Sequence, residues 1–368
     1  MLHDSMPSDN IRRILMTTDT VGGVWTYALE MAHLLQENQV QVALAAMGRL
    51  PDESQLEELE KLGNVTLFSS SYKLEWMEDP WDEIHEAEKW LRQICADFRP
   101  DLVHLNQFTF GQMSFGIPKL VVGHSCIYSW YESVKKSVPD ECWNTYRKNV
   151  TRGLTGANAV TAPSFTMLKY LKKYYGNFKS MGAVYNCRSL HSFSPAVKKE
   201  NLVVSAGRLW DEAKNIKLLA DAAERINAPV CIAGEDVSPA GEAMRFQNVN
   251  ITGKLSYREL ADILSRASIF VSPARYEPFG LSILEAALSG CALVLGDIPS
   301  LRELWDDAAI FIKPDDGEAL TENVNRLIED EQLCNMYREK ARQRAECFKP
   351  ARTKNEYMWL YNQILQES

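Results

Sequence analysis

Short apolar segments alternate with helical stretches along most of this 368-residue chain, and this alternation constrains the fold more than any other feature. In the first half the segments are RRILMTT, QVQVALAAM, NVTLFSS, DLVHLNQ, KLVVGHS and NAVTAPS. A second series follows, with NLVVSAGRL, PVCIAGE, VNITGK, SIFVSPA, ALVLGD and AIFIKP. Buried strands separated by helices form βαβ units, so the pattern predicts an α/β protein with parallel sheets.

The two series predict two domains. Between them lies YNCRSLHSFSPAVKKEN, residues 185–201, which is polar and has no periodicity, as expected of a linker. The chain is also longer than one hydrophobic core usually organises. We therefore expect one domain over 1–190, a second over 198–350 and a final helix over 351–368.

Composition excludes several classes of protein. The net charge is −9, which argues against nucleic-acid binding because phosphate contacts need clustered Lys and Arg. No apolar run approaches the ~20 residues that span a bilayer, and MLHDSMPSDNIRR lacks the apolar region of a signal peptide. The eight cysteines are scattered without a C-x-x-C pair, so we expect reduced thiols in a cytoplasmic protein.

The segment RYEPFGLSILEAALSG, residues 275–290, carries the strongest functional signal. It follows an apolar strand, so Glu277 falls on a strand-to-helix loop and Glu285 in the next helix. Gly280 lets the backbone approach a ligand, and the first N–H groups of a helix suit an anion. Carboxylates beside such a site accept hydrogen bonds from vicinal hydroxyls, which favours a ligand with a sugar joined to a phosphate.

A second candidate is SAGRLWDEAKNIKLL, residues 205–219, where a strand ends at Gly207. Arg208 and Lys214 follow on the loop and the helix start. Arg binds phosphate as a bidentate fork and Lys as a point charge, so both are candidate phosphate ligands.

In the first half, Gly22 and Gly23 open a helix directly after a strand. This arrangement is compatible with a backbone-lined anion site and with a tight packing turn; it is not G-x-G-x-x-G, which disfavours a dehydrogenase. His124 ends the strand KLVVGHS, where its ring can donate to a sugar hydroxyl or to developing charge. His104 ends another strand and is compatible with a site wall or with the core.

Together these residues resemble the E-x7-E signature of the family-4 glycosyltransferases, with EPFG inside the motif. The resemblance covers essentially the whole chain, most closely residues 202–314. It implies the GT-B fold: two Rossmann-like domains facing a cleft, with the last helix crossing back onto the N-terminal acceptor domain. One departure is Cys187 after Asn186, where the family usually has Gly, although Phe193-Ser194-Pro195 is kept.

The resemblance also implies roles for individual residues. Glu285 would bind the ribose hydroxyls and Glu277 the hydroxyls of the donor sugar. The remaining donor contacts would come from side chains and backbone groups of Gly22, Gly23, Arg208, Lys214, Lys254, Leu255, Phe279, Gly280 and Leu281. The catalytic group would then consist of His124, Glu277, Arg208 and Lys214. No D-x-D motif lies in a suitable loop, and the family is metal-independent, so we expect no metal and no cofactor besides the nucleotide sugar.

We therefore expect a retaining hexosyltransferase that moves a sugar from a UDP- or GDP-sugar to a hydroxyl of a sugar, lipid-linked or small-molecule acceptor. Glycan, glycolipid or cell-surface polysaccharide synthesis is the expected setting. Two alternatives are a non-catalytic nucleotide-sugar-binding subunit or sensor, and a sugar phosphorylase or hydrolase on the same fold.

Two features bear on the acceptor side. Tyr128, Trp130 and Tyr131 are compatible with a sugar-stacking platform and with core packing. LKYLKKYYG, residues 168–176, has three Lys interleaved with Tyr and Leu. This pattern is compatible with a peripheral contact at the inner membrane and with a solvated helix face.

Overall fold

The computed structural model describes residues 11–189, 193–196, 198–238 and 241–367. The chain divides into two compact units. Unit 1 comprises Met1–Ile127, Pro139–Val184 and Pro350–Ser368; unit 2 comprises Tyr128–Val138 and Tyr185–Lys349. The domain limits expected at residues 1, 190 and 368 lie outside the described residues.

Unit 1 is built on a parallel seven-stranded sheet. In spatial order its strands are β3 (Val65–Ser69), β2 (Gln41–Met47), β1 (Arg13–Asp19), β4 (Leu102–Leu105), β5 (Lys119–Val122), β6 (Ala159–Ala162) and β7 (Ser180–Ala183). The central strands are almost fully buried because apolar residues face both layers of helices, as parallel sheets require. The sequence pattern did not predict β7.

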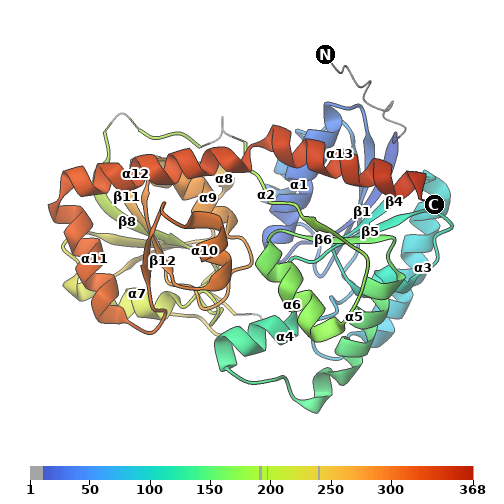
Figure 1. Ribbon diagram of the computed structural model, residues 1–368, viewed down its shortest axis with the longest axis horizontal. Helices are drawn as coiled ribbons and strands as arrows, with labels where there is room; N and C mark the ends of the chain where they lie inside the picture. The colour runs from blue at the N-terminus through green and yellow to red at the C-terminus, as the bar shows by residue number, and fades with distance from the viewer. Residues whose placement is uncertain (1–10, 190–192, 197, 239–240, 368) are drawn as a thin grey trace. The chain divides into compact units, whose positions relative to one another are not determined.

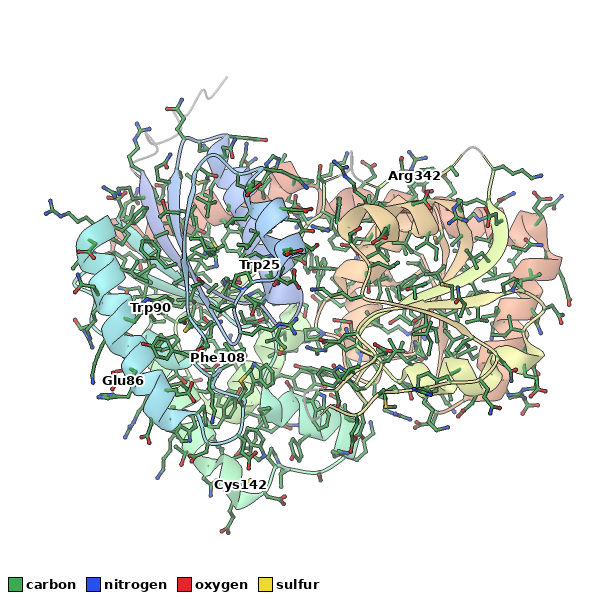
Figure 2. The ribbon with its side chains drawn as sticks, turned by 180° about the vertical axis from the view of Figure 1, so that it is seen from behind. Trp25, Glu86, Trp90, Phe108, Cys142 and Arg342 are labelled. Carbon is green, nitrogen blue, oxygen red and sulfur yellow. The ribbon has the colours of Figure 1, made fainter. Side chains whose placement is uncertain are left out.

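The helices of unit 1 are α1 (Gly23–Gln36), α2 (Glu53–Leu59), α3 (Trp81–Phe98), α5 (Asn144–Gly156), α6 (Phe165–Tyr175) and α13 (Pro350–Gln366). Figure 2 shows Glu86 on the outward face of α3, whereas Phe108 is buried within the unit. The last helix, α13, belongs to unit 1 and packs on α1 (Figure 1). The chain thus returns to its first unit, as the GT-B resemblance implies.

Unit 2 is built on a parallel six-stranded sheet. Its strands, in spatial order, are β10 (Asn250–Gly253), β9 (Val230–Ala233), β8 (Glu200–Ala206), β11 (Ala267–Ser272), β12 (Ala292–Gly296) and β13 (Ile310–Ile312). Its main helices are α7 (Ile216–Ala222), α8 (Tyr257–Arg266), α9 (Leu281–Leu288), α10 (Pro299–Trp305), α11 (Gly317–Glu329) and α12 (Glu331–Ala345). Apolar side chains form a core cluster on each face of the sheet.

Both sheets reverse their strand order at one point, which marks where doubly wound sheets bind ligands. In unit 1 the reversal lies between β1 and β4, and in unit 2 between β8 and β11. The structure confirms the predicted α/β class with two Rossmann-like halves. It also places the loops named from the sequence, after β1, β8 and β11, at these reversal points.

Candidate active site

The site in unit 2 begins with a close approach of two backbone loops. Gly207 follows β8 and Gly234 follows β9, where a Cβ on Gly234 would lie 1.8 Å from the Gly207 carbonyl oxygen. The stem of Lys214 lies over Gly207, since a Cβ there would be 3.3 Å from the lysine Cγ and Cδ. Glycine at these positions therefore lets Lys214 run across the end of β8.

Lys214 reaches Glu277 across the reversal point. Its Nζ donates to Glu277 Oε2 at 2.5 Å, and the two side chains are 22% and 11% exposed. A pair this sheltered is desolvated enough for the charges to interact more strongly than at an exposed surface. The structure thus brings together two residues that the sequence separates by 63 positions.

The loop carrying Glu277 is fixed by its backbone. Ser300 on α10 donates from Oγ to the Glu277 carbonyl oxygen at 2.6 Å, and the Arg275 N–H donates to the Ala213 carbonyl oxygen at 2.8 Å. Gly280 caps α9 with a φ of +87°, a conformation that favours glycine. Sequence reasoning identified Gly280 but missed Ser300, because an isolated serine at a helix start has many ordinary uses.

Asn215 is a second positioning residue that the sequence did not reveal. Its φ is +55°, and its Nδ2 donates to the carbonyl oxygens of Pro273 at 2.9 Å and Pro314 at 2.6 Å. These bonds tie the start of α7 to the ends of β11 and β13. Asparagine adopts this left-handed backbone conformation more readily than most residues do.

Arg208 is held beside the same loop by Asp211. Its Nη2 donates to Asp211 Oδ2 at 2.6 Å, and its guanidinium lies 5.1 Å from the centre of the Trp210 ring. Burial acts to raise the pKa of Asp211, but the charges of Arg208 and Lys214 outweigh it and leave that pKa lowered. A buried, ionised Asp211 therefore holds Arg208 near the end of β8 and also attracts Lys214.

Glu285 is paired with a residue that the sequence analysis did not identify. It is buried on α9, where its Oε1 accepts from Arg188 Nε at 2.7 Å. The exposed fractions of the two side chains are only 6% and 8%. Arg188 lies in the segment between the two sheets and was missed, since a lone Arg in an aperiodic linker carries no local signal.

The other predicted donor residues of unit 2 have mixed surroundings. The Phe279 side chain is buried in the core and meets Phe348 edge-on at 5.5 Å between ring centres, so only its backbone faces the loop. Leu281 begins α9 and is half-buried. Lys254 is exposed and Leu255 half-buried in the turn before α8, whose start is closed by a capping box of Ser256 and Glu259.

In unit 1, Gly22 caps α1 in an extended conformation and Gly23 is exposed at the first helical position. The Val21 N–H donates to Asp19 Oδ1 at 3.0 Å, which closes the turn after β1. This is the reversal point of the first sheet, where open backbone N–H groups are available to an anion.

His124 is anchored by Asn106. The Asn106 amide donates from Nδ2 to the Thr17 carbonyl oxygen at 2.7 Å, so its Oδ1 accepts from His124 Nε2 at 2.8 Å. Burial lowers the pKa of His124 to about 3, so the ring is neutral at pH 7. With Nε2–H engaged, Nδ1 carries the lone pair. The ring then offers an acceptor at Nδ1 rather than the donor expected from the sequence.

His104 belongs to the core. It is fully buried, its Nδ1 lies 2.7 Å from the Tyr361 hydroxyl and its Nε2 lies 3.2 Å from the Tyr27 hydroxyl, which in turn donates to Tyr357 at 2.6 Å. Burial, with a smaller effect of His124, lowers the pKa of His104 to about 3. This network fixes α13 to the inside of unit 1 and resolves the choice between site wall and core.

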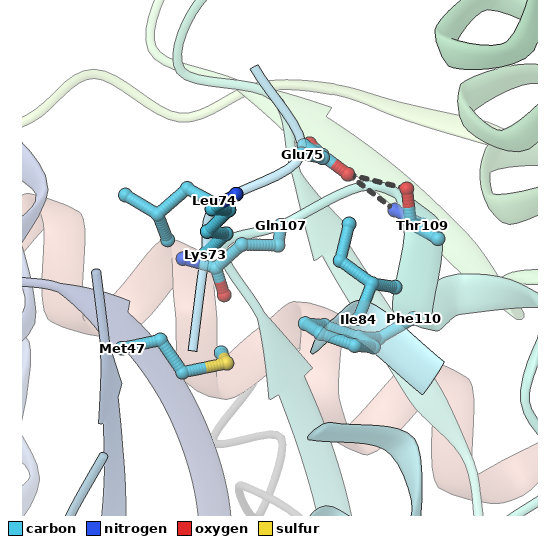
Figure 3. Close-up of a pocket in the computed structure, with 8 residues that line it drawn as sticks. All are labelled: Met47, Lys73, Leu74, Glu75, Ile84, Gln107, Thr109 and Phe110. Carbon is cyan, nitrogen blue, oxygen red and sulfur yellow. Dashed lines mark hydrogen bonds between the residues drawn. The ribbon is translucent and has the colours of Figure 1, made fainter. Parts of the chain in front are cut away.

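A narrow recess without room for a water molecule lies beside the carboxyl ends of β2 and β4 (Figure 3). Glu75 accepts there from the Thr109 hydroxyl at 2.6 Å and the Thr109 N–H at 2.8 Å, and burial raises its pKa. Among the residues that the structure describes, neither polar atom of the buried Gln107 amide has a hydrogen-bond partner. None of these residues belongs to a motif that is recognisable in the sequence.

The aromatic segment Tyr128–Val138 packs with unit 2. Ser129 and Tyr276 join their hydroxyls at 2.8 Å, and Lys135 donates to Glu212 at 2.7 Å. Tyr128 is buried, whereas Trp130 and Tyr131 are half-buried and meet edge-on. In the sequence, Tyr276 directly precedes Glu277 and Glu212 directly follows Asp211, so both contacts lie on the loops predicted to bind the donor.

Within the described part of the chain, no group of three or more His, Cys, Asp or Glu side chains is placed to hold a metal ion. No helix in the same residues has the length and apolar character needed to cross a membrane.

Two family models match the chain side by side. The model described as Glycosyltransferase Family 4 matches residues 21–188, and the model described as Glycosyl transferases group 1 matches residues 188–344. Their junction falls at the start of unit 2. The chain therefore belongs to the family-4 glycosyltransferases of the GT-B fold.

Curated relatives include the O-antigen chain mannosyltransferase C of Escherichia coli, 31% identical over 45% of this chain and 47% of the relative. Another is the N,N'-diacetylbacillosaminyl-diphospho-undecaprenol alpha-1,3-N-acetylgalactosaminyltransferase of Campylobacter jejuni, 27% identical over 46% of each. The matched stretch spans just under half the length of these relatives.

Solved structures extend the similarity of fold to nearly the whole chain. A sucrose-phosphate synthase from Thermosynechococcus elongatus has a TM-score of 0.81 at 17% identity, covering 97% of this chain and 100% of that one. The Anabaena protein HepE in complex with UDP-glucose has a TM-score of 0.75 at 16% identity, with the same coverage.

Proposed function

We propose that this protein is a metal-independent, retaining hexosyltransferase that moves a sugar from a nucleoside diphosphate sugar to a hydroxyl acceptor. The observation that carries the proposal is the Lys214–Glu277 pair at the reversal point of the second sheet, beside Arg208. A carboxylate there accepts bonds from sugar hydroxyls, and the cations match a diphosphate.

The charge that develops on the departing diphosphate needs preorganised positive groups. Lys214 is positioned by Glu277 and by Gly207, and Arg208 by Asp211, so neither cation has to be ordered during the reaction. Two fixed cations can do the work that a metal ion performs in other transferases. Metal independence is proposed on this basis.

Retention is proposed to follow from attack on the same face as the leaving group, with the departing phosphate oxygen accepting the acceptor's proton. Glu277 binds the sugar in this scheme, since its carboxylate already engages Lys214 and its backbone is held by Ser300. A carboxylate tied in this way is a positioned acceptor of hydrogen bonds rather than a nucleophile.

The comparisons support a nucleotide-sugar donor, for which we propose a UDP or GDP group, and a role in glycan or cell-surface polysaccharide synthesis. One structural neighbour was solved with UDP-glucose, and curated relatives act on O-antigen chains or a diphospho-undecaprenol acceptor. A lipid-linked or sugar acceptor fits these relatives, and a cytoplasmic location fits a nucleotide-sugar donor.

The test is turnover of a panel of UDP-, GDP- and ADP-sugars by the purified protein, with EDTA present. One donor should be consumed, Lys214→Met and Glu277→Gln should lower kcat/KM at least about 100-fold, and Lys217→Met should match the wild type. The anomeric configuration of the product, read by NMR, should equal that of the donor. Donor binding without turnover would instead support a non-catalytic sensor or subunit, and release of free sugar or sugar phosphate a hydrolase or phosphorylase.

We also propose a peripheral contact with an anionic membrane. From residue 142 to residue 199 the sequence contains no Asp or Glu, although the chain as a whole is acidic. Six of the exposed cations in this stretch lie on two helices that pack together, α5 and α6; they are Arg147, Lys148, Arg152, Lys169, Lys172 and Lys173. Phe165, 51% exposed, begins α6.

Such a basic surface with an exposed aromatic ring suits an anionic lipid headgroup layer. The protein should sediment with vesicles containing phosphatidylglycerol and not with pure phosphatidylcholine, and less so as salt rises. Changing Lys169, Lys172 and Lys173 together to Gln should abolish sedimentation, whereas changing Lys61 and Lys89 should not. Equal sedimentation of both variants would rule out this surface.

A further inference from the structure

The interdomain segment supplies a buried cation to the inside of unit 2. Arg188 is 7% exposed and lies between three groups: its Nε bonds Glu285, and its guanidinium lies 4.8 Å from the Tyr257 ring centre and 5.5 Å from that of Phe193. The two rings meet edge-on at 4.9 Å. Arg188 is therefore fixed on its faces by aromatic rings and at its edge by a carboxylate.

This arrangement favours the ionised form of the Glu285 carboxylate and restrains its orientation. A carboxylate with 6% of its side chain exposed would lose most of its hydration, and a paired guanidinium compensates for that loss. Arg188 Nε donates to one defined oxygen, Oε1, and this bond restrains the orientation of the carboxylate. The rings of Tyr257 and Phe193 lie against the guanidinium and restrain its position.

The surroundings indicate which part of a donor this carboxylate meets. Tyr257 is the first residue of α8, directly after the turn that holds Lys254 and Leu255. Glu285 lies on α9, more than one helical turn after Gly280, the residue that caps this helix. We expect the donor phosphate at that cap. A ribose between a phosphate and a base presents two adjacent hydroxyls, which are donors suited to a carboxylate.

We infer that Arg188 is a positioning residue for donor recognition: it holds the Glu285 carboxylate ionised and oriented to accept the ribose hydroxyls of a nucleoside diphosphate. This inference rests on the proposed function, because it assigns a residue to the same donor site. It makes the selection of a ribose over a deoxyribose depend on a residue of the segment that joins the two sheets.

The inference is tested by calorimetric titration of UDP, GDP and ADP, together with their 2′-deoxy and 3′-deoxy forms, into the wild-type protein and variants. The ribonucleotide that binds the wild type should bind about 10- to 100-fold more tightly than its deoxy forms, the effect of hydrogen bonds to a charged group. In Arg188→Met and Glu285→Gln that preference should shrink to less than about threefold. Arg188→Lys should retain an intermediate preference.

Arg266→Met is the matched control. Arg266 also pairs with carboxylates in unit 2, but its side chain is 41% exposed, so its loss should leave the preference unchanged. Arg188→Lys and the charge-neutral pair Arg188→Met with Glu285→Gln keep the test open should Arg188→Met alone fail to fold. In the double variant the preference should again be lost while the thermal transition stays near that of the wild type.

A purely structural Arg188 predicts a different result: its variants would bind all nucleotides more weakly while the ratio of ribose to deoxyribose affinity stayed at the wild-type value. That outcome, or a wild type without preference, overturns the inference alone. Binding with the expected preference but without turnover of any sugar would refute the proposed transferase and leave the inference standing. No binding of any nucleotide by the wild type would refute both.

Discussion

Replacing Lys214 by Met should destabilise unit 2 by about 2 kcal/mol. The Lys214–Glu277 pair has side chains 22% and 11% exposed, which places it between two known limits. Breaking a fully buried pair costs about 3–5 kcal/mol, whereas exposed pairs contribute about 0–1 kcal/mol. Lys217→Met is the matched control, since Lys217 and Asp221 are 72% and 60% exposed and their pair should contribute less than about 0.5 kcal/mol.

The assay is a double-mutant cycle that combines Lys214→Met with Glu277→Gln, with the thermal unfolding of each variant measured by calorimetry. The single change at Lys214 should lower the Tm of unit 2 by about 4–8 °C, because about 1 kcal/mol shifts a domain of this size by about 2–4 °C. The double variant should recover part of the loss, since it leaves no unpaired charge, and the coupling should be about 1.5–2 kcal/mol. Additive effects, within about 0.5 kcal/mol, would show that the two charges do not stabilise each other.

Three further outcomes follow from the geometry. Burial lowers the pKa of His104 and His124 to about 3 from 6.5, so only the unfolded chain takes up protons just below pH 6.5. Unit 1 should therefore be fully stable above that pH and lose about 1.4 kcal/mol per pH unit for each histidine below it, with a shallower calorimetric slope in His104→Gln. Gly280→Ala, at φ +87°, should cost about 1–2 kcal/mol and raise the donor KM in steady-state assays. Ser300→Ala removes a 2.6 Å hydrogen bond to the Glu277 carbonyl oxygen. We expect kcat/KM to fall about fivefold while expression stays normal. An unchanged kcat/KM would show that this hydrogen bond does not contribute to catalysis.

The sequence was sufficient to predict the alternation of strands and helices, because parallel strands buried on both faces read as continuous apolar runs. It missed β7, whose residues Ser180–Ala183 include a glycine and only short apolar side chains. That strand forms because β6 offers it an open edge with parallel register, which is a tertiary effect.

The candidate site was predictable where residues are local to one motif. Glu277, Gly280 and the Arg208–Lys214 loop fall within short stretches whose spacing relative to a strand end is visible in the sequence. Pairings across long separations were not visible: Arg188 meets Glu285 across 97 positions, and His104 meets Tyr361 across 257. In each pair, no local sequence pattern indicates which distant residue is the partner.

The two reversal points differ in how they can act on a ligand. In unit 2 the groups at the strand ends are charged and mutually restrained: Lys214 with Glu277, Arg208 with Asp211, and Arg188 with Glu285 within the helix layer. In unit 1, β5 lies one strand away from the reversal point, and the loop after it presents a neutral histidine whose proton is committed to Asn106. Fixed charges stabilise a group whose charge changes during reaction, whereas a neutral ring with a lone pair suits a hydroxyl that must be oriented without being ionised. The division of charge between the units therefore supports a donor that leaves as an anion from unit 2 and an uncharged hydroxyl bound by unit 1.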